Sequence, residues 1–513
     1  MLVCTATTGS YYVAPPTSSR GHVYSIPVVL TGAVNEAPTT LGVADSTLYN
    51  LSDADLSATL DHLKDMGVND IRIAVPWIYI EQSNQNYNWS TMDRVVQAAS
   101  QRGMNIVGVI SGTPSWAGFP LNGHSDPAAY ARFAGAVAQR YNDDSTIGAI
   151  DDFEIWNEPN GALFYNPVDA AAYTRMLQAA YPAIKTNNPN AVVIAGVLGA
   201  VRTISGISLA PQSFLKQMYS AGAEGYFDAL SYHPYHYTLP FSSGSGVADS
   251  PLEQVKALRA LMDANGDADL KIWATEYGLP TNYPITQSQQ AAFIHDFVVA
   301  WQNVAGAGPM FIYTTRDSNT GGFDDEENFG LFKTNWTPKA AVATVTELIH
   351  QLQTGTLQPF DVTPFANKVD FFGAAVILIR QFINLVAIVP KALFQLANSA
   401  VTVITHAIGS LLGIARPAAA ATVTAQKSAS DEADEAAPTA NVAAAQPDRK
   451  AVARAVPRPK LSVPRVAAAA ESPALAAASG KSTTAKASAS ASTPTKPKVK
   501  AHTGGPAPRP GVN

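Results

Sequence analysis

The feature of this chain that most restricts its fold is a regular alternation of short apolar runs with longer amphipathic runs. The expected strands are residues 41–44, 70–77, 104–110, 150–156, 191–196, 227–232, 270–275 and 309–313. The expected helices are residues 52–66, 89–102, 126–141, 169–186, 210–221, 251–264, 286–304 and 339–352. Strands that are apolar throughout are buried on both faces, as in a parallel sheet. Eight such units in series predict an α/β fold of the (β/α)8 TIM-barrel type.

Composition excludes several other classes of protein. No GxGxxG motif follows the first strand, which disfavours an open dinucleotide-binding sheet. The single cysteine, Cys4, excludes an intramolecular disulfide and a cysteine-based zinc site. The net charge of −6 conceals an asymmetry, because the chain from Arg416 onward carries 14 Lys and Arg against 6 Asp and Glu. The acidic remainder argues against a nucleic-acid-binding fold, whereas a basic tail suits an anionic surface.

The pattern divides the chain into an N-terminal lead-in over residues 1–37, a catalytic barrel over 38–355, an apolar amphipathic helical segment over 356–415 and a tail over 416–513. Arg380, Gln381, Asn384 and Lys391 interrupt the apolar stretch 371–415 and fall near one helical face. This favours an amphipathic helix over a membrane span, and leaves open whether it lies on the barrel, on another subunit or on a membrane surface.

The tail is rich in Ala, Pro, Ser, Thr and Lys and has no aromatic residue. Such a composition cannot bury enough apolar surface to offset its ordering entropy, so we expect disorder. No clear secretory signal peptide opens the chain. We nevertheless expect a secreted or cell-envelope-associated protein, with the segment 371–513 as the part that associates with a membrane surface or envelope.

Two glutamates fall where a barrel of this type has its active site, at the C-terminal ends of the strands. The motif Trp-Asn-Glu-Pro-Asn places Asn157 and Glu158 after the fourth strand, and the seventh strand ends at Glu276. Two carboxylates across a cleft suit glycoside cleavage, in which one protonates the leaving oxygen and the other attacks the anomeric carbon or activates water. A close pair predicts retention and a wider pair inversion, and the sequence leaves both open.

Other strand ends carry residues suited to a sugar site. The candidates for substrate binding are Asn157, His233, Tyr235, Arg72, Trp77, Trp116 and Tyr313. Aromatic faces stack on pyranose rings, amides and imidazoles bond hydroxyls, and an Arg near the nucleophile would hold it ionised. Trp77 fits equally well as a core aromatic.

Several polar residues have a structural interpretation instead. His233 and His236 lack a nearby third ligand, so no metal site and no cofactor are expected. The acidic run of Asp324, Asp325, Glu326 and Glu327 is expected to form a solvated loop, and the sequence leaves open whether this loop covers the site or binds calcium. Asp151, Asp152 and Glu154 are expected to be structural or exposed.

The motifs IRIAVPW, GTPSWA, WNEPN, SYHPY, ATEYG and ENFGLF together resemble those of clan A glycoside hydrolases. They are most similar to glycoside hydrolase family 39, in particular its exopolysaccharide-cleaving and β-xylosidase-like members. Family 5 cellulase-type barrels share the Asn-Glu pair and are the nearest rivals. The resemblance covers about residues 38–352 and implies a retaining mechanism through a covalent glycosyl-enzyme.

The resemblance also implies roles for individual residues. Glu158 would be the acid/base, Glu276 the nucleophile, Asn157 the partner of the substrate 2-hydroxyl, His233 and Tyr235 the lining of the subsite, and Arg72 the residue that orients the nucleophile. Clan A members often carry Trp at the end of strand eight, where this chain has Tyr313, and this difference leaves the sugar open. The alternative to a hydrolase of β-linked polysaccharide or oligosaccharide is a catalytically inactive carbohydrate-binding or envelope-anchored barrel. An aldolase-like barrel is disfavoured, because Lys271 lies at a strand start.

Overall fold

The structure, a computed structural model, describes residues 32–366, 376–377 and 380. The expected tail over 416–513 lies outside these residues, as does most of the expected helical segment within 356–415. None of the helices in the described parts of the chain is long and apolar enough to cross a membrane.

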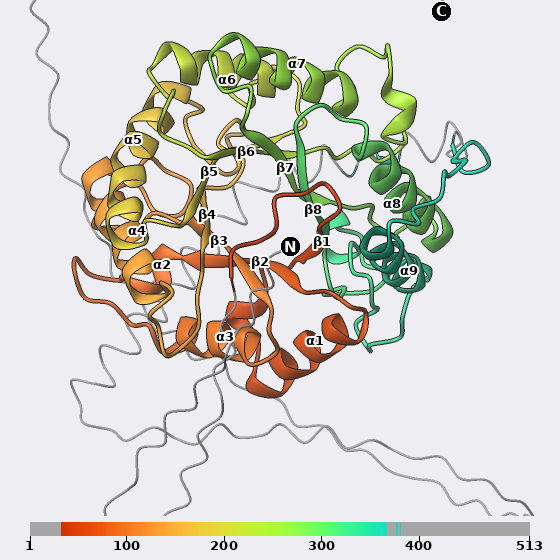
Figure 1. The fold of residues 1–513 in the computed structure, drawn as a ribbon, viewed down its shortest axis with the longest axis horizontal. Helices are drawn as coiled ribbons and strands as arrows, with labels where there is room; N and C mark the ends of the chain where they lie inside the picture. The colour runs from red at the N-terminus through yellow and green to blue at the C-terminus, as the bar shows by residue number, and fades with distance from the viewer. Residues whose placement is uncertain (1–31, 367–375, 378–379, 381–513) are drawn as a thin grey trace, which may run out of the picture. The chain divides into compact units, whose positions relative to one another are not determined.

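Eight parallel strands close into a barrel in sequence order, which confirms the predicted (β/α)8 fold (Figure 1). The strands are β1 (Leu41–Ala44), β2 (Asp70–Pro76), β3 (Asn105–Ser111), β4 (Asp152–Ile155), β5 (Val192–Gly199), β6 (Ala229–His233), β7 (Lys271–Tyr277) and β8 (Ala307–Tyr313). The barrel closes where β1 pairs with β8, in a register that places Leu41 opposite Met310 and Ala44 opposite Tyr313.

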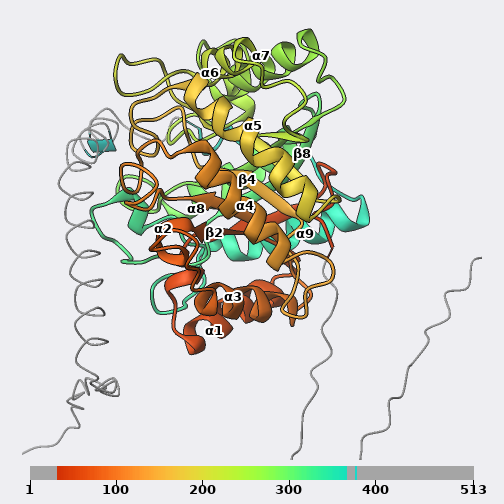
Figure 2. The same cartoon turned by 90° about the vertical axis from the view of Figure 1, so that its left-hand side faces the viewer.

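Helices surround the barrel, as the two perpendicular views show (Figures 1 and 2). They are α1 (Asp53–Asp65), α2 (Trp77–Ile80), α3 (Ser90–Ser100), α4 (Pro127–Arg140), α5 (Ala170–Asn187), α6 (Pro211–Ser220), α7 (Pro251–Ala264), α8 (Gln287–Trp301) and α9 (Ala340–Thr354). Short 3-10 turns lie at η1 (Leu48–Asn50), η2 (Ser242–Gly244) and η3 (Asp325–Glu327). Polar caps begin several of these helices: Ser52, which the sequence predicts as a cap, accepts from the Asp55 amide, and Thr286 and Gln289 form a capping box.

Side chains fill the barrel interior, so that the fold is a packed core and not a pore. An interior cluster consists of Val34, Ala44, Val107, Ile194, Ala229, Trp273 and Phe311. At its N-terminal end, the Val34 amide donates to Asp152 Oδ2 at 2.8 Å, and Asp152 is fully buried. A Cβ on Gly42 would lie 2.6 Å from the Phe311 ring, so the close packing of β1 requires glycine.

The long connection between β8 and α9 carries the acidic run and is tied to the barrel by a buried ion pair. Lys339 Nζ lies 2.7 Å from Asp317 Oδ1, and neither side chain is exposed. The same Nζ donates to Thr281 Oγ1 at 2.7 Å and to the Asn328 carbonyl at 3.0 Å. A buried charge is stable only when it is paired and hydrogen-bonded, so these contacts determine the course of the loop.

Candidate active site

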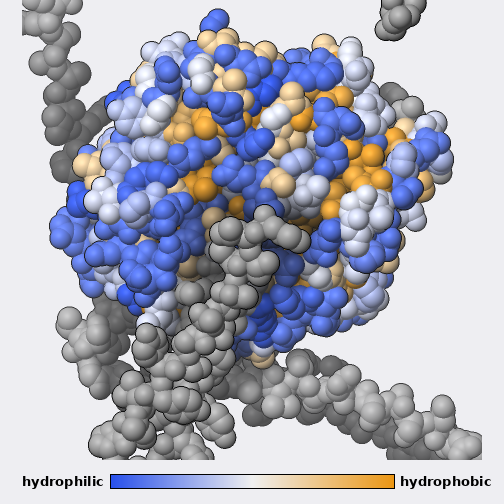
Figure 3. Space-filling model, in the orientation of Figure 1, coloured by the Kyte–Doolittle hydropathy of each residue, from blue (hydrophilic) through white to orange (hydrophobic). Residues whose placement is uncertain are grey.

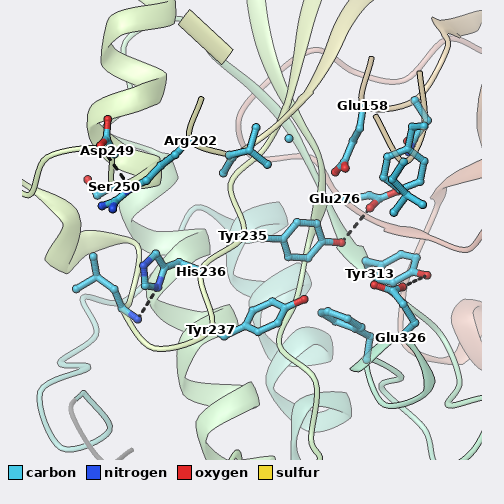
Figure 4. A pocket seen from close by; sticks show the side chains of 18 of the residues that line it. Glu158, Arg202, Tyr235, His236, Tyr237, Asp249, Ser250, Glu276, Tyr313 and Glu326 are labelled. Carbon is cyan, nitrogen blue, oxygen red and sulfur yellow. Dashed lines mark hydrogen bonds and ion pairs between the residues drawn. The ribbon is translucent and has the colours of Figure 1, made fainter. Parts of the chain in front are cut away.

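A cleft of about 1010 Å³ opens at the C-terminal ends of the strands (Figure 4). Its lining includes most of the residues that the sequence nominated, namely Arg72, Asn157, Glu158, Tyr235, Glu276 and Tyr313. They come from β2, from the turn after β4, from the loop after β6, and from β7 and β8. The closed barrel therefore brings together residues that are far apart in sequence.

The turn after β4 aims Glu158 into the cleft. Trp156 and Glu158 have φ values of 73° and 41°, in the left-handed region that residues other than glycine rarely adopt. The turn is held against β5, because the Glu158 amide donates to the Val197 carbonyl at 3.0 Å. Asn160 secures it further, with hydrogen bonds of 2.9 Å in both directions to the Gly199 backbone. Non-glycine strain of this kind is common at functional sites, where the surroundings determine the backbone.

His233 joins the two glutamates. Its Nδ1 lies 2.9 Å from Glu158 Oε1 and 3.6 Å from Glu276 Oε2, and one oxygen of each carboxylate lies within 4.8 Å of the other. On the other side of the ring, Nε2 lies 3.0 Å from Thr275 Oγ1, which lies 2.5 Å from Ser231 Oγ. Because His233 is fully buried, these partners determine the orientation of its ring.

Glu276 is surrounded by groups that favour its ionised form. Burial by itself would raise the pKa of this carboxyl, but the electrostatic interactions with His233 and Arg72 lower it. Hydrogen bonds act in the same direction: Tyr235 Oη donates to Oε2 at 3.0 Å, and Arg72 Nη1 donates to Oε1. The net result is a Glu276 pKa below its ordinary value.

Arg72 is held by a third carboxylate that does not line the cleft. Its Nε donates to Glu154 Oε2 at 2.7 Å and its Nη2 donates to Asn157 Oδ1 at 2.8 Å. Burial alone would lower the Arg72 pKa, but the charges of Glu154 and Glu276 raise it above its ordinary value. Glu154, which we expected to be structural or exposed, is fully buried and structural. An arginine on an apolar strand requires a buried acid, and that was the signal that could have identified this partner.

Glu326 is a cleft residue that the sequence analysis missed. Tyr313 Oη donates to Glu326 Oε2 at 3.3 Å, and both residues line the cleft beside Glu276 (Figure 4). The protein groups around this carboxyl desolvate it in part, although its side chain stays exposed to the open cleft. This desolvation, together with the charges of Glu276 and Glu158, raises the pKa of Glu326 to about 7. The expectation of a solvated acidic loop agrees with Glu326, whose side chain is exposed, but is wrong for the neighbouring Asp325, which is only 3% exposed.

Two of the nominated aromatic residues do not line the cleft. Trp77 is completely buried, and its ring packs on Phe133 while its Nε1 donates to Glu81 Oε2 at 2.6 Å. Trp116 packs edge-on against Trp77 and donates to the Glu81 carbonyl at 2.8 Å. The assignment of Trp77 to substrate binding is therefore wrong, whereas Trp116 is partly exposed and lies outside the lining of this cleft. The chain enters α2 at Trp77, which carries the ring into the layer between the barrel and its helices.

Among the described residues, Glu158, His233 and Glu276 form the one group whose atoms could meet a single metal ion. The arrangement fits such an ion poorly, because the Arg72 guanidinium already faces Glu276 and His233 Nδ1 is directed at Glu158. His236, the other histidine that the sequence analysis considered, accepts a hydrogen bond from the Leu239 amide at its Nδ1. The geometry is that of two carboxyl groups, Glu158 and Glu276, each held by hydrogen bonds to neighbouring side chains.

Residues 34–305 match the family model described as Cellulase (glycosyl hydrolase family 5). The chain belongs to this family. This match confirms the predicted resemblance to clan A glycoside hydrolases. The matching model is that of family 5, which the sequence pattern had placed second to family 39. No curated protein sequence matches the chain.

Solved structures of similar fold include glycoside hydrolases of both families. A family 39 glycoside hydrolase from the gut symbiont Bacteroides cellulosilyticus WH2 is 22% identical, with a TM-score of 0.50 over 62% of this chain and 64% of that one. A monomeric beta-xylosidase from Caulobacter crescentus CB15 is 18% identical, with a TM-score of 0.47 over 62% and 69%. GH5_18 from Streptomyces cattleya, in complex with GlcNAc, is 15% identical, with a TM-score of 0.48 over 63% and 82%. The chain thus spans less than two thirds of the length of the family 39 protein, and at this identity the likeness concerns the fold alone.

Proposed function

We propose that this family 5 member is a retaining glycoside hydrolase that cleaves a β-linked polysaccharide or oligosaccharide. The observation that carries the proposal is the close approach of Glu158 and Glu276, whose nearest oxygens lie within 4.8 Å. Carboxyl groups are about 5–5.5 Å apart in retaining enzymes and about 6.5–9.5 Å apart in inverting ones, which need room for a water between sugar and base. Two oxygens within 4.8 Å of each other agree with the shorter of these separations and thus support direct attack by one carboxylate.

In the first step of this mechanism, the Glu276 carboxylate attacks the anomeric carbon while the bond to the leaving oxygen breaks. Glu158 donates its proton to that oxygen, and a covalent glycosyl-enzyme forms on Glu276. In the second step, Glu158 takes a proton from water, the water oxygen attacks the anomeric carbon, and the ester bond to Glu276 breaks. Two inversions give net retention.

The surroundings support this division of roles. A nucleophile must be ionised before attack, and the contacts of Glu276 with Arg72 and Tyr235 lower its pKa. Glu158 faces His233 instead, and it projects into the cleft from the strained turn. Arg72 orients the Asn157 amide, in keeping with a role for Asn157 in binding the substrate 2-hydroxyl. We also propose that the substrate resembles those of family 39 glycoside hydrolases. This proposal rests on the resemblance of the motifs around these residues to family 39 motifs. Tyr313 occupies the position where clan A members often have tryptophan.

The test compares wild-type protein with Glu276→Ala and Glu158→Ala on activated aryl glycosides. We expect losses on the order of 10⁴-fold for each variant, as for removal of a group that acts in the reacting constellation. Azide should rescue Glu276→Ala with a product of inverted configuration, and Glu158→Ala with a retained one. Glu347→Ala, an exposed glutamate on α9, serves as the control. Full activity of either active-site variant contradicts the proposal.

A mechanism-based inhibitor should label the peptide that contains Glu276, as mass spectrometry would show, and a glycan panel would identify the sugar. Binding of glycans by the wild-type protein without hydrolysis across the panel would favour the alternative, a catalytically inactive carbohydrate-binding or envelope-anchored barrel. The close approach of Glu158 and Glu276 in the cleft favours an active enzyme over this alternative.

We further propose a secreted or cell-envelope location, with association through residues 371–513. The basic composition of 416–513 supports binding to an anionic surface, which weakens with salt because exposed charges are screened. The full chain should sediment with anionic vesicles at low salt and be released at high salt. A chain that ends at residue 415 should keep its activity and lose the salt-sensitive binding. Identical sedimentation of the two proteins would contradict a role for the tail.

A further inference from the structure

The wall of the cleft includes a residue from the segment that follows the barrel. Ile377 lines the cleft and is 3% exposed. It belongs to a small apolar cluster with Leu279 and Ile285, which follow β7, with Phe293 of α8 and with Val362. The described residues beyond α9 therefore pack against the β7 side of the site.

Arg380, three positions further on, reaches the acidic loop. Its Nε lies 3.0 Å from Asp325 Oδ1, and the two side chains are 3% and 4% exposed. Its Nη1 donates to the Tyr283 carbonyl. Asn282 Nδ2 donates to the same Asp325 oxygen at 3.1 Å, so the turn after β7 and Arg380 hold Asp325 together.

Asp325 precedes Glu326, the carboxylate that faces Glu276 and Glu158 across the cleft (Figure 4). Three carboxylates in one cleft repel one another, and this repulsion contributes to the raised pKa of Glu326. A loop without an anchor would relieve the repulsion by moving Glu326 into solvent. The buried pair with Arg380 opposes that movement.

We propose that Arg380 is a positioning residue for substrate binding, which holds the loop so that Glu326 accepts a hydrogen bond from a sugar hydroxyl beside Tyr313. Glu326 is suited to this because it stays accessible from the cleft while Tyr313 Oη, 3.3 Å away, orients its carboxylate. Arg380 itself lies behind the loop and acts through Asp325. The inference rests on the proposed glycoside hydrolysis and adds a subsite determinant from outside the barrel.

The kinetic test is a double-mutant cycle in the full-length chain. Glu326→Gln should raise KM about tenfold with little change in kcat, the loss of one hydrogen bond to a charged group. Arg380→Met should raise KM by a similar factor, and the double variant should be no worse than either single variant, because both remove the same contact. Additive effects on KM, or an unchanged KM in Arg380→Met, would overturn the proposal.

A second readout does not depend on activity. Amide hydrogen exchange over residues 321–328 should be faster in Arg380→Met than in wild-type protein, and unchanged in Arg102→Met, which removes a partly exposed ion pair with Asp61 at another site. If Arg380→Met does not fold, Asp325→Asn removes the charge of the same pair with little change of shape. Unchanged exchange in the folded variant refutes the anchoring role. Absence of hydrolysis by wild-type protein would instead refute the proposed function, and the exchange result would still decide whether Arg380 anchors the loop.

Discussion

Arg72 Nε donates a hydrogen bond of 2.7 Å to Glu154 Oε2, and both side chains are closed off from solvent. Glu154 does not line the cleft, whereas Arg72 does, and their pairing leaves the two terminal nitrogens of Arg72 directed at Glu276 and Asn157. A residue without substrate contact thus determines where the positive charge of the site lies. Because a buried charge without a partner is strongly destabilising, the two residues depend on each other.

Replacing Arg72 by Met should raise the pKa of Glu276, since the positive charge that favours its ionised form is removed. In wild-type protein, the lowered pKa of Glu276 places the acid limb of the kcat/KM profile at low pH. Because the substitution removes the charge that lowers this pKa, the limb should move to higher pH. Activity at neutral pH should fall on the order of 100-fold, as when one preorganised electrostatic contact is removed. Rates measured between pH 3 and pH 8, with circular dichroism to verify folding, provide the check. An acid limb at its original position would contradict the role of Arg72.

Gly199→Ala should displace Glu158. A Cβ at Gly199 would lie 3.1 Å from the Glu158 carboxyl carbon and 3.2 Å from both of its oxygens, so the carboxylate must move. A displacement of this kind should lower kcat about 10–100-fold without unfolding the protein. Gly161→Ala is the matched control, because the nearest atom to its new Cβ would be 3.7 Å away. Equal activities of the two variants would argue against tight positioning of Glu158.

Thr275→Val removes the hydroxyl that contacts His233 Nε2 at 3.0 Å. A threonine that donates to Nε2 keeps the ring proton on Nδ1, where it faces Glu158, so its loss allows the other tautomer. We expect kcat to fall about tenfold for aryl glycosides with poor leaving groups, and less for good ones, which need little acid assistance. Ser231→Ala, one contact further away, should have a smaller effect. The same loss for all leaving groups would place the effect outside the proton transfer.

Lys339→Met should destabilise the protein by about 3–5 kcal/mol, because it leaves the fully buried Asp317 charge without its partner. Urea unfolding followed by fluorescence would measure the change. Lys64→Met, at an exposed lysine of α1, should alter the free energy of unfolding by less than about 0.5 kcal/mol. A small effect at Lys339 would mean that the loop between β8 and α9 is held by its other contacts.

The sequence predicted the elements of the barrel closely because its strands are continuous apolar runs bounded by helix caps. The expected strand at 41–44 coincides with β1, and the expected helix at 251–264 coincides with α7. The four-residue α2 was missed, because a single turn has no periodicity to detect. Because α2 begins at Trp77, the Trp77 ring lies in the layer between the barrel and its helices and not in the cleft. One missed element thus led to one wrong site assignment.

Residue type and position at a strand end were enough to nominate Glu158 and Glu276 from the sequence alone, since the C-terminal ends of barrel strands always meet at one mouth. Only the tertiary structure decided which side chains contact those glutamates and hold them in place. Three contacts could not be read from the sequence, namely those of Arg72 with Glu154, Tyr313 with Glu326 and Arg380 with Asp325. Each joins residues that are separated along the chain, and each depends on whether a side chain points towards the cleft or away from it. Hydrophobic periodicity is a local property and can be read along the chain, whereas the partner of a buried charge is determined by the closure of the barrel and the course of its loops.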